Sequence, residues 1–212
     1  MTDAANWTER HAAAAMAWDT TPNQFVVAAC RRLHPGRALD LSAGDGSISV
    51  WLAGRGWRVT AIEADTVQVG RIQSHSALMG KPVDAIVGDA VGHRPPSAAF
   101  DLILLSYLQL PEHQLRQVLS HVAPALAPGG LLLIVGHDAT NLGGGWGGPQ
   151  VPDLLTTAAH LADLLGGLGL EVHRAEVVRR EVPGEVGLHI ALDHVVEAVR
   201  PAPDAARSRR SG

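Results

Sequence analysis

A-L-D-L-S-A-G-D-G, residues Ala38–Gly46, is the stretch of this 212-residue sequence that decides its fold. A short apolar run ends there in a turn of small residues, and Ser47–Ala53 then follows as a predicted helix. Gly44 and Gly46 allow the backbone to turn sharply and to approach a ligand without a Cβ clash, and the amino end of the next helix points at that ligand. Glu63, nineteen residues after Gly44, ends the next predicted strand and is placed to accept hydrogen bonds from ribose hydroxyls. The segment therefore predicts a nucleotide-cofactor site.

Outward from this motif, strands and helices alternate. Strands are predicted at 38–41, 58–62, 83–87, 100–106 and 131–135, and helices at 47–53, 65–79, 111–126 and 153–165. This order indicates βαβ units, with a parallel sheet covered by helices on both faces. The last two predicted strands, 170–181 and 188–199, are joined by a short turn, so they must pair antiparallel. The predicted fold is α/β, a Rossmann-like, doubly wound, mostly parallel seven-stranded sheet with an antiparallel last strand.

The chain is expected to form one domain over residues 1–200. Two helices, at 4–16 and 22–33, are predicted to form a cover within residues 1–35, ahead of a core at 37–199. Residues 201–212, which contain three arginines, are predicted to be a disordered tail.

Composition narrows the possible partners and the compartment. The net charge is −4 and the core contains no basic run, which argues against a nucleic-acid substrate. There is no run of 18 apolar residues and no signal peptide, so neither membrane insertion nor export is expected. Cys30 is the single cysteine, which fits a cytoplasmic protein, and the scattered histidines predict no metal site. The oligomeric state stays open.

A second polar step follows the third predicted strand. In I-V-G-D-A, residues 86–90, Asp89 can accept from an exocyclic amine and the amide of Ala90 can donate to a ring nitrogen, so the pair is suited to reading adenine. A strand-end aspartate that caps its own turn is the alternative explanation.

Five segments together resemble the class I S-adenosylmethionine-dependent methyltransferases. They are D-L-S-A-G-D-G at 40–46, E-A-D at 63–65, G-D-A at 88–90, F-D-L-I-L-L-S-Y at 100–107 and L-A-P-G-G-L-L-L-I-V at 126–135. The resemblance covers about Arg37 to Val199. Within the class, the chain resembles the small-molecule branch near the tellurite-resistance and thiopurine methyltransferases, through Trp18, P-N-Q-F at 22–25, W-L-A-G-R-G-W at 51–57 and the glycine-rich segment 136–150.

The resemblance implies S-adenosylmethionine as the cofactor, S-adenosylhomocysteine as its product and a small-molecule acceptor. It assigns the cofactor to Asp40, Ser42, Gly44, Gly46, Glu63, Ala64, Asp89, Ala90, Ser106 and Trp18. Ser42 stands where the family usually has glycine, so a negative φ is expected there, and Ile48 stands where relatives often have a polar residue.

Methyl transfer is a one-step displacement, so positioning can supply most of the acceleration. A base is needed only when the acceptor must lose a proton. His137 and Tyr107 are the predicted catalytic residues, and His113 and Asp138 are further candidates. For His137, the alternative is a structural hydrogen bond to Asp138. The glycine-rich loop around Trp146 is a candidate lid.

Two other functions fit the same motif less well. A nicotinamide-dependent oxidoreductase would need a third glycine where Ser49 stands, and it would not usually end in an antiparallel hairpin. A non-catalytic S-adenosylmethionine-binding module is favoured only by Ser42 and Ile48.

Overall fold

The computed structural model describes residues 22–184 and 186–202. In chain order, its elements are α2 (Gln24–Cys30), β1 (Arg37–Leu41), α3 (Ser47–Ala53), β2 (Arg58–Glu63), α4 (Thr66–Leu78), β3 (Val83–Val87), β4 (Phe100–Ser106), α5 (Glu112–Val122), β5 (Leu126–His137), α6 (Asn141–Gly144), α7 (Ala158–Gly167), β6 (Glu171–Pro183) and β7 (Leu188–Val199), with 3-10 turns at Ala123–Ala125 and Pro152–Leu154. The predicted helix at 4–16, Trp18 and most of the predicted tail lie outside the described residues.

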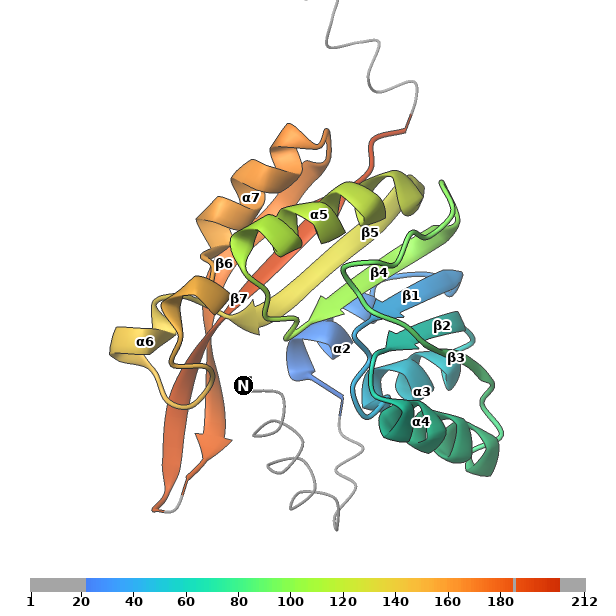
Figure 1. Cartoon of the computed structure of the whole chain (residues 1–212), viewed down its shortest axis with the longest axis horizontal. Coiled ribbons are helices and arrows are strands. Elements are labelled where there is room, and N and C mark those ends of the chain that lie inside the picture. The colour runs from blue at the N-terminus through green and yellow to red at the C-terminus, as the bar shows by residue number, and fades with distance from the viewer. Residues whose placement is uncertain (1–21, 185, 203–212) are drawn as a thin grey trace, which may run out of the picture.

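The strands form one seven-stranded sheet in the order β3-β2-β1-β4-β5-β7-β6 (Figure 1). β1 to β5 run parallel, and β7 lies between β5 and β6, antiparallel to both. The predicted mostly parallel sheet with an antiparallel ending is confirmed.

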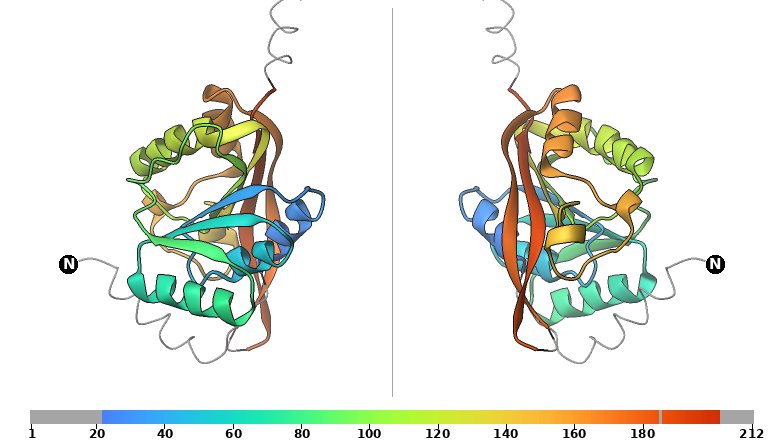
Figure 2. Two further views of the ribbon diagram at one scale, coloured as in Figure 1. Left: turned by 90° about the vertical axis from the view of Figure 1, so that its right-hand side faces the viewer. Right: turned by 90° about the vertical axis from the view of Figure 1, so that its left-hand side faces the viewer.

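Side chains that alternate along the central strands pack into two separate hydrophobic cores, one on each face of the sheet. Leu39 and Ile103 face the layer formed by α5 and α7. Ala38 and Leu102, their immediate neighbours in the sequence, face the layer that contains α2 and α3. Figure 2 shows α2 on the side of the sheet opposite to α5 and α7. Both faces are covered, which explains why β4 reads as a continuous apolar run.

The β6–β7 hairpin extends past the carboxyl edge of the parallel strands (Figure 1). The β5–β7 ladder ends where His137 pairs with Asp193, whereas the β6–β7 ladder continues to Pro183 and Leu188. Parallel strands deliver their functional side chains at the same edge, so the hairpin adds a wall beside the expected site.

Several predicted boundaries were wrong. The helix predicted at 111–126 ends at Val122, since Pro124 cannot donate a helical hydrogen bond, and β5 already begins at Leu126. The helix predicted at 153–165 begins only at Ala158, where the Thr157 hydroxyl accepts from the amide of His160 at 3.1 Å.

Candidate functional site

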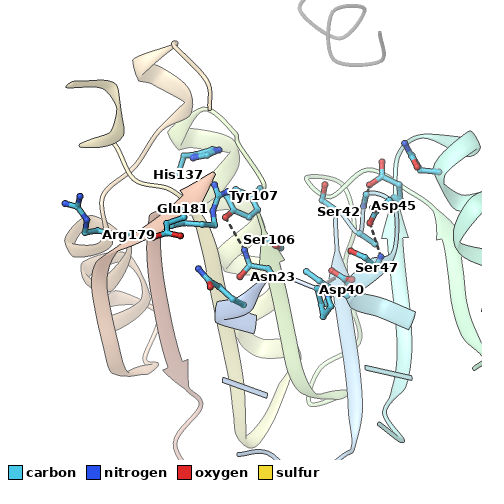
Figure 3. A pocket seen from close by; sticks show the side chains of 18 residues that line it. Asn23, Asp40, Ser42, Asp45, Ser47, Ser106, Tyr107, His137, Arg179 and Glu181 are labelled. Carbon is cyan, nitrogen blue, oxygen red and sulfur yellow. Dashed lines mark hydrogen bonds between the residues drawn. The ribbon is translucent and has the colours of Figure 1, made fainter. Parts of the chain in front are cut away.

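A cavity of about 1030 Å³ lies at the carboxyl edge of the sheet. It is lined by Pro22, Asn23, Gln24, Asp40, Ser42, Ala43, Gly44, Asp45, Ser47, Ile48, Glu63, Gln68, Ser106, Tyr107, His137, Arg179, Arg180 and Glu181. Figure 3 shows these side chains in two groups, one around the glycine turn and one around Tyr107 and His137, with Ser106 between them. Ligand pockets usually measure roughly 300–1,000 Å³, so this cavity has room for a cofactor and an acceptor.

The glycine turn is more strained than expected. Ser42 has φ +69°, so the prediction of a negative φ at this serine is wrong. Its amide donates to the carbonyl of Ile62 at 2.8 Å, which holds the residue in this conformation. A non-glycine residue in the left-handed region costs about 1–2 kcal/mol, and such strain collects at functional sites.

Glycine is required at the two positions of the turn for different steric reasons. Gly44 has φ +57°, and a Cβ built on it would meet no atom within 4 Å, so its open side is the cavity that it lines. Gly46 has φ +78° and caps α3, but its Cβ would overlap the side chain of Ile72. Gly46 therefore serves close packing against α4, and only Gly44 borders the cavity.

The Glu63 carboxylate ties the turn to the end of β2. Its Oε2 accepts from the amide of Gly44 at 2.8 Å, and its Oε1 accepts from the amide of Asp65 at 3.0 Å. Each carboxylate oxygen has a further lone pair, so a ribose hydroxyl can add to these bonds. Glu63 lines the cavity at the position expected from the sequence.

Asp40 has one oxygen with no partner. Its side chain is almost fully buried, its Oδ2 accepts from the Ser49 hydroxyl at 2.6 Å, and no hydrogen bond reaches Oδ1. Burial raises the pKa of this carboxyl to about 6, with further raising contributions from Asp45 and Glu63 and an opposing one from the Ser49 hydrogen bond. A buried acceptor without a partner is costly, and a cationic donor in the cavity would satisfy it.

The negative charge around the glycine turn favours a cationic cofactor over a dinucleotide. Asp40, Asp45 and Glu63 line this end, and none of the described residues that line it there is basic. The ammonium and sulfonium groups of S-adenosylmethionine would be attracted to such a site, whereas the pyrophosphate of a dinucleotide would be repelled. Ser49, where a third glycine would stand, is fully buried and bonded to Asp40. The described residues thus fit S-adenosylmethionine.

The structure does not bring all the predicted cofactor residues to the cavity. Ala64 and Ala90 are not among its lining residues. The Asp89 carboxylate, also outside the lining, accepts from the amides of Val91 and Gly92, each at 3.1 Å, and so caps its own turn. An adenine-reading role for Asp89 and Ala90 stays a prediction.

At the other end of the cavity, Tyr107 is fixed by its hydroxyl. It donates to Asp193 Oδ2 at 2.6 Å and accepts from the side-chain amide of Asn23 at 3.1 Å. Burial, together with the charge of Asp193, raises the pKa of the Tyr107 phenol above its usual value. Its backbone lies at φ +53°, a second strained position beside the cavity.

Asp193 contacts three side chains at this end of the cavity, those of Tyr107, Arg180 and His137. This aspartate was not predicted from the sequence as a site residue. It is completely buried in β7, and Arg180 of β6 donates to its Oδ2 at 2.6 Å. Burial opposes ionisation, but the His137 contact and the hydrogen bonds from Arg180 and Tyr107 outweigh it and hold the Asp193 pKa at about 2. The available signal in the sequence was an aspartate in the middle of a largely apolar strand, L-H-I-A-L-D-H-V-V-E-A-V, because a buried acid needs polar partners.

His137 faces Asp193 and does not fix its loop through Asp138. Its Nδ1 lies 3.2 Å from Asp193 Oδ1. The Asp138 carboxylate instead accepts from Thr140 and from the amide of Ala158. The predicted alternative, a His137–Asp138 hydrogen bond, is therefore wrong, and Asp138 is a structural residue at the start of α7.

The glycine-rich loop packs over His137. A Cβ on Gly148 would lie 2.9 Å from the imidazole ring, so only glycine fits against it there. The Asn141 side chain donates to the carbonyl of Gly147 at 2.8 Å and accepts from the amide of Leu192 at 2.8 Å. Trp146 stacks on His189 with ring centroids 3.9 Å apart. The loop is thus attached to β7, and its role as a lid stays a prediction.

Comparison with known proteins places this geometry in a class. Residues 38–130 match the family model described as a methyltransferase domain. Among solved structures, the chain is similar to a protein from a study of the conversion of a disulfide bond into a thioacetal group during echinomycin biosynthesis (TM-score 0.69, 20% identity, covering 92% of this chain and 88% of that one). It is also similar to a SAM-dependent methyltransferase from Methanosarcina mazei, with a TM-score of 0.66 and 18% identity, covering 82% of this chain and 97% of that one. A third similar structure is TehB from Haemophilus influenzae, with a TM-score of 0.69 and 17% identity, covering 85% of this chain and 62% of that one.

The solved structures share the fold of this chain, and the domain match covers its glycine turn and the carboxyl ends of β2, β3 and β4. Residues 38–130 form a methyltransferase domain, and the solved structures that share the fold include S-adenosylmethionine-dependent methyltransferases. This domain implies S-adenosylmethionine as the cofactor and S-adenosylhomocysteine as its product. No helix within the described ranges is long and apolar enough to cross a membrane.

Proposed function

We propose that this chain transfers the methyl group of S-adenosylmethionine to a small-molecule acceptor bound beside Tyr107 and His137. One observation carries the proposal: a single cavity joins the carboxylate-lined glycine turn to the polar group of Tyr107, His137 and Arg180. A small molecule at the second end would meet a cofactor held at the first.

The cofactor end would be held by Asp40, Ser42, Gly44 and Glu63, with Ser106 between the two ends. When bound, S-adenosylmethionine supplies an electrophilic methyl group on a good leaving group. The unpartnered Oδ1 of Asp40 is suited to the ammonium of the methionine part, and Glu63 to the ribose hydroxyls. These residues bind and orient; they carry no proton in the transfer.

The acceptor end would be formed by Asn23, Tyr107, His137 and Arg180, with Arg179 and Glu181 from the same hairpin strand. Its donors and acceptors suit a polar small molecule. His137 is the proposed base when the acceptor must lose a proton, because its imidazole lines this end of the cavity. The fold similarity to TehB leaves the acceptor open, so membership of the tellurite-resistance and thiopurine branch rests on the sequence resemblance alone.

A binding test and an activity test together decide the proposal. S-adenosylhomocysteine at 100 times its dissociation constant should stabilise the chain by about 2.7 kcal/mol, and NAD should not. The second test measures S-adenosylhomocysteine release with a panel of small phenols, thiols, amines and carboxylic acids. Stabilisation by NAD alone would reject the cofactor site. Binding without turnover of the panel would favour the non-catalytic module.

A further inference from the structure

We infer that Asp193 is a positioning residue that keeps the proton of neutral His137 on Nδ1, so that Nε2 takes a proton from a protic acceptor, a hydroxyl or a thiol. This inference rests on the proposed function, because it assigns the chemistry of the acceptor end. In the transfer, the X–H bond of the acceptor breaks and its electron pair forms the new bond to the methyl carbon. The methyl–sulfur electron pair stays on sulfur, and the proton ends on Nε2 of His137.

The sheet itself places the two side chains together. His137 and Asp193 are a direct cross-strand pair at the end of the β5–β7 ladder, and directly opposed side chains in an antiparallel pair are close neighbours. Their facing atoms, Nδ1 and Oδ1, are 3.2 Å apart, within ion-pair distance, although the ring N–H is not aligned for a hydrogen bond. At this distance the negative carboxylate favours a proton on Nδ1 electrostatically. A carboxylate that faces one ring nitrogen selects the tautomer with the proton on that nitrogen.

The other partners of Asp193 fix its orientation. Oδ2 accepts from the Tyr107 hydroxyl and from Arg180 Nε, each at 2.6 Å. Arg180 Nη2 lies 3.5 Å from Oδ1. Because Oδ2 is occupied from two sides, Oδ1 is left facing His137. The Arg180 guanidinium also compensates the buried charge, which keeps Asp193 ionised and acceptor-only.

His137 is the better base of the two predicted catalytic residues. The Tyr107 phenol already donates its proton to a buried carboxylate, and its pKa is raised, so it remains a donor. Among the described residues, no hydrogen bond reaches Nε2 of His137, and His137 lines the cavity, so we take Nε2 as the nitrogen open to an acceptor. Gly148 on one side and the Tyr107 ring, 5.1 Å away, hold the imidazole in place.

A base held at this end of the cavity indicates an acceptor that must lose a proton when it is methylated. A thioether sulfur or a selenoether selenium has a free electron pair and no proton to lose, so it needs no base. A phenol or a thiol must lose its proton as it is methylated, and general-base catalysis then contributes about 100-fold or more.

The positioning role is tested by the tautomer of His137. The full chain is labelled with 15N-histidine and saturated with S-adenosylhomocysteine, and long-range 1H–15N spectra are recorded at alkaline pH. The His137 signals are those missing from His137→Gln. In the wild type, Nδ1 should carry the proton and Nε2 should not. A neutral His137 with its proton on Nε2 would overturn the inference without any variant.

Asp193→Asn should invert the tautomer. The asparagine oxygen must serve Tyr107 and Arg180, so its NH2 group faces His137 and forces the proton onto Nε2. Asp138→Asn is the matched control, a buried neighbouring acid that does not contact the imidazole, and it should leave the tautomer unchanged. An unchanged tautomer in a folded Asp193→Asn variant would overturn the positioning role.

Activity then tests the acceptor class with named probes. Phenol and 2-phenylethanethiol, which keep their protons at neutral pH, represent protic acceptors, and dimethyl sulfide and dimethyl selenide represent acceptors with no proton to lose. Asp193→Asn should lower kcat with a protic probe about 100-fold and leave S-adenosylhomocysteine affinity unchanged. Turnover of a protic probe that survives Asp193→Asn undiminished would overturn the inference, and so would a wild type that methylates only the probes with no proton to lose. Absence of S-adenosylhomocysteine binding to the wild type would instead reject the proposed function.

Discussion

His137 and Asp193 stand opposite one another where the β5–β7 ladder ends, with the histidine Nδ1 3.2 Å from the aspartate Oδ1. The pair lies beside the cavity that begins at the glycine turn on β1. It couples the antiparallel hairpin, which is the most distinctive part of the sheet, to the acceptor end of the site. The hairpin is thus part of the proposed site as well as of the fold.

Glu63→Gln should weaken S-adenosylhomocysteine binding about 10- to 100-fold, which corresponds to about 1–3 kcal/mol for a charged acceptor. One side-chain oxygen becomes an NH2 group that must face the amide of Gly44 or of Asp65. Isothermal titration calorimetry measures the change. Glu112→Gln, at an exposed position outside the cavity, is the control. Equal affinities in wild type and Glu63→Gln would reject the ribose role.

Asp40 should make both stability and cofactor affinity depend on pH. Its folded pKa of about 6 lies above the ordinary 3.8, so its protonated form is favoured in the fold. This stabilisation is complete below about pH 4 and is lost as the pH rises through about 6, about 3 kcal/mol in all. Binding of the product ammonium should favour the ionised form, so affinity should rise over the same interval.

Denaturation and titration calorimetry from pH 4 to pH 8 check both effects, with Asp40→Asn as the comparison. His194, whose pKa burial lowers to about 4, also makes stability depend on pH in both chains, so the Asp40 contribution is read from the difference between them. The free energy of unfolding of the wild type minus that of Asp40→Asn should fall as the pH rises, and the affinity of the variant should not rise. An affinity that rises equally steeply in Asp40→Asn would assign the effect to another group.

Ser42→Gly should stabilise the chain by about 1 kcal/mol. The serine has φ +69°, a conformation that glycine adopts without steric cost. Ser47→Gly, in the first turn of α3, should act in the opposite sense because glycine is a poor helix former. Thermal unfolding of the two variants gives the signs, and a lower Tm for Ser42→Gly would show that its side chain contributes more than its strain costs.

Gly44→Ala and Gly46→Ala should separate binding from packing. Gly44 opens onto the cavity, so its alanine should weaken S-adenosylhomocysteine binding with only a modest loss of stability, about 1 kcal/mol. Gly46 lies against Ile72, so its alanine should lower the free energy of unfolding by more than that, about 2–4 kcal/mol. Identical losses of Tm in the two variants would contradict this division.

Trp146→Ala should release the loop over His137. The tryptophan is attached by its stack on His189 and by its amide, which donates to Ile190 at 2.8 Å. Loss of the stack should cost about 1 kcal/mol and speed amide hydrogen exchange across residues 143–149. Affinity for S-adenosylhomocysteine should not change, since Trp146 does not line the cavity. Unaltered exchange would show that Asn141 alone holds the loop.

Local patterns predicted much of this molecule. The bounds of α3, β3, β4 and β7 match the sequence prediction residue for residue, because apolar alternation and glycine or proline breaks are properties of short segments. The helix predicted at 153–165 failed for the opposite reason. Thr156 forms an isolated bridge with Asp138, a contact from a distant part of the chain that overrides helix propensity.

The sequence by itself determined the α/β class and the antiparallel ending, and it predicted the proposed cofactor end of the site. Glycines at a strand-to-helix turn and an acid at the next strand end lie close together in any parallel βαβ unit. Only the tertiary structure brought together the residues of the proposed acceptor end. Register places Asp193 opposite His137, and a shift of one residue would have turned its side chain to the other face of the sheet. Strand register depends on long-range pairing, which no local pattern encodes, so this buried acid emerged only from the folded sheet.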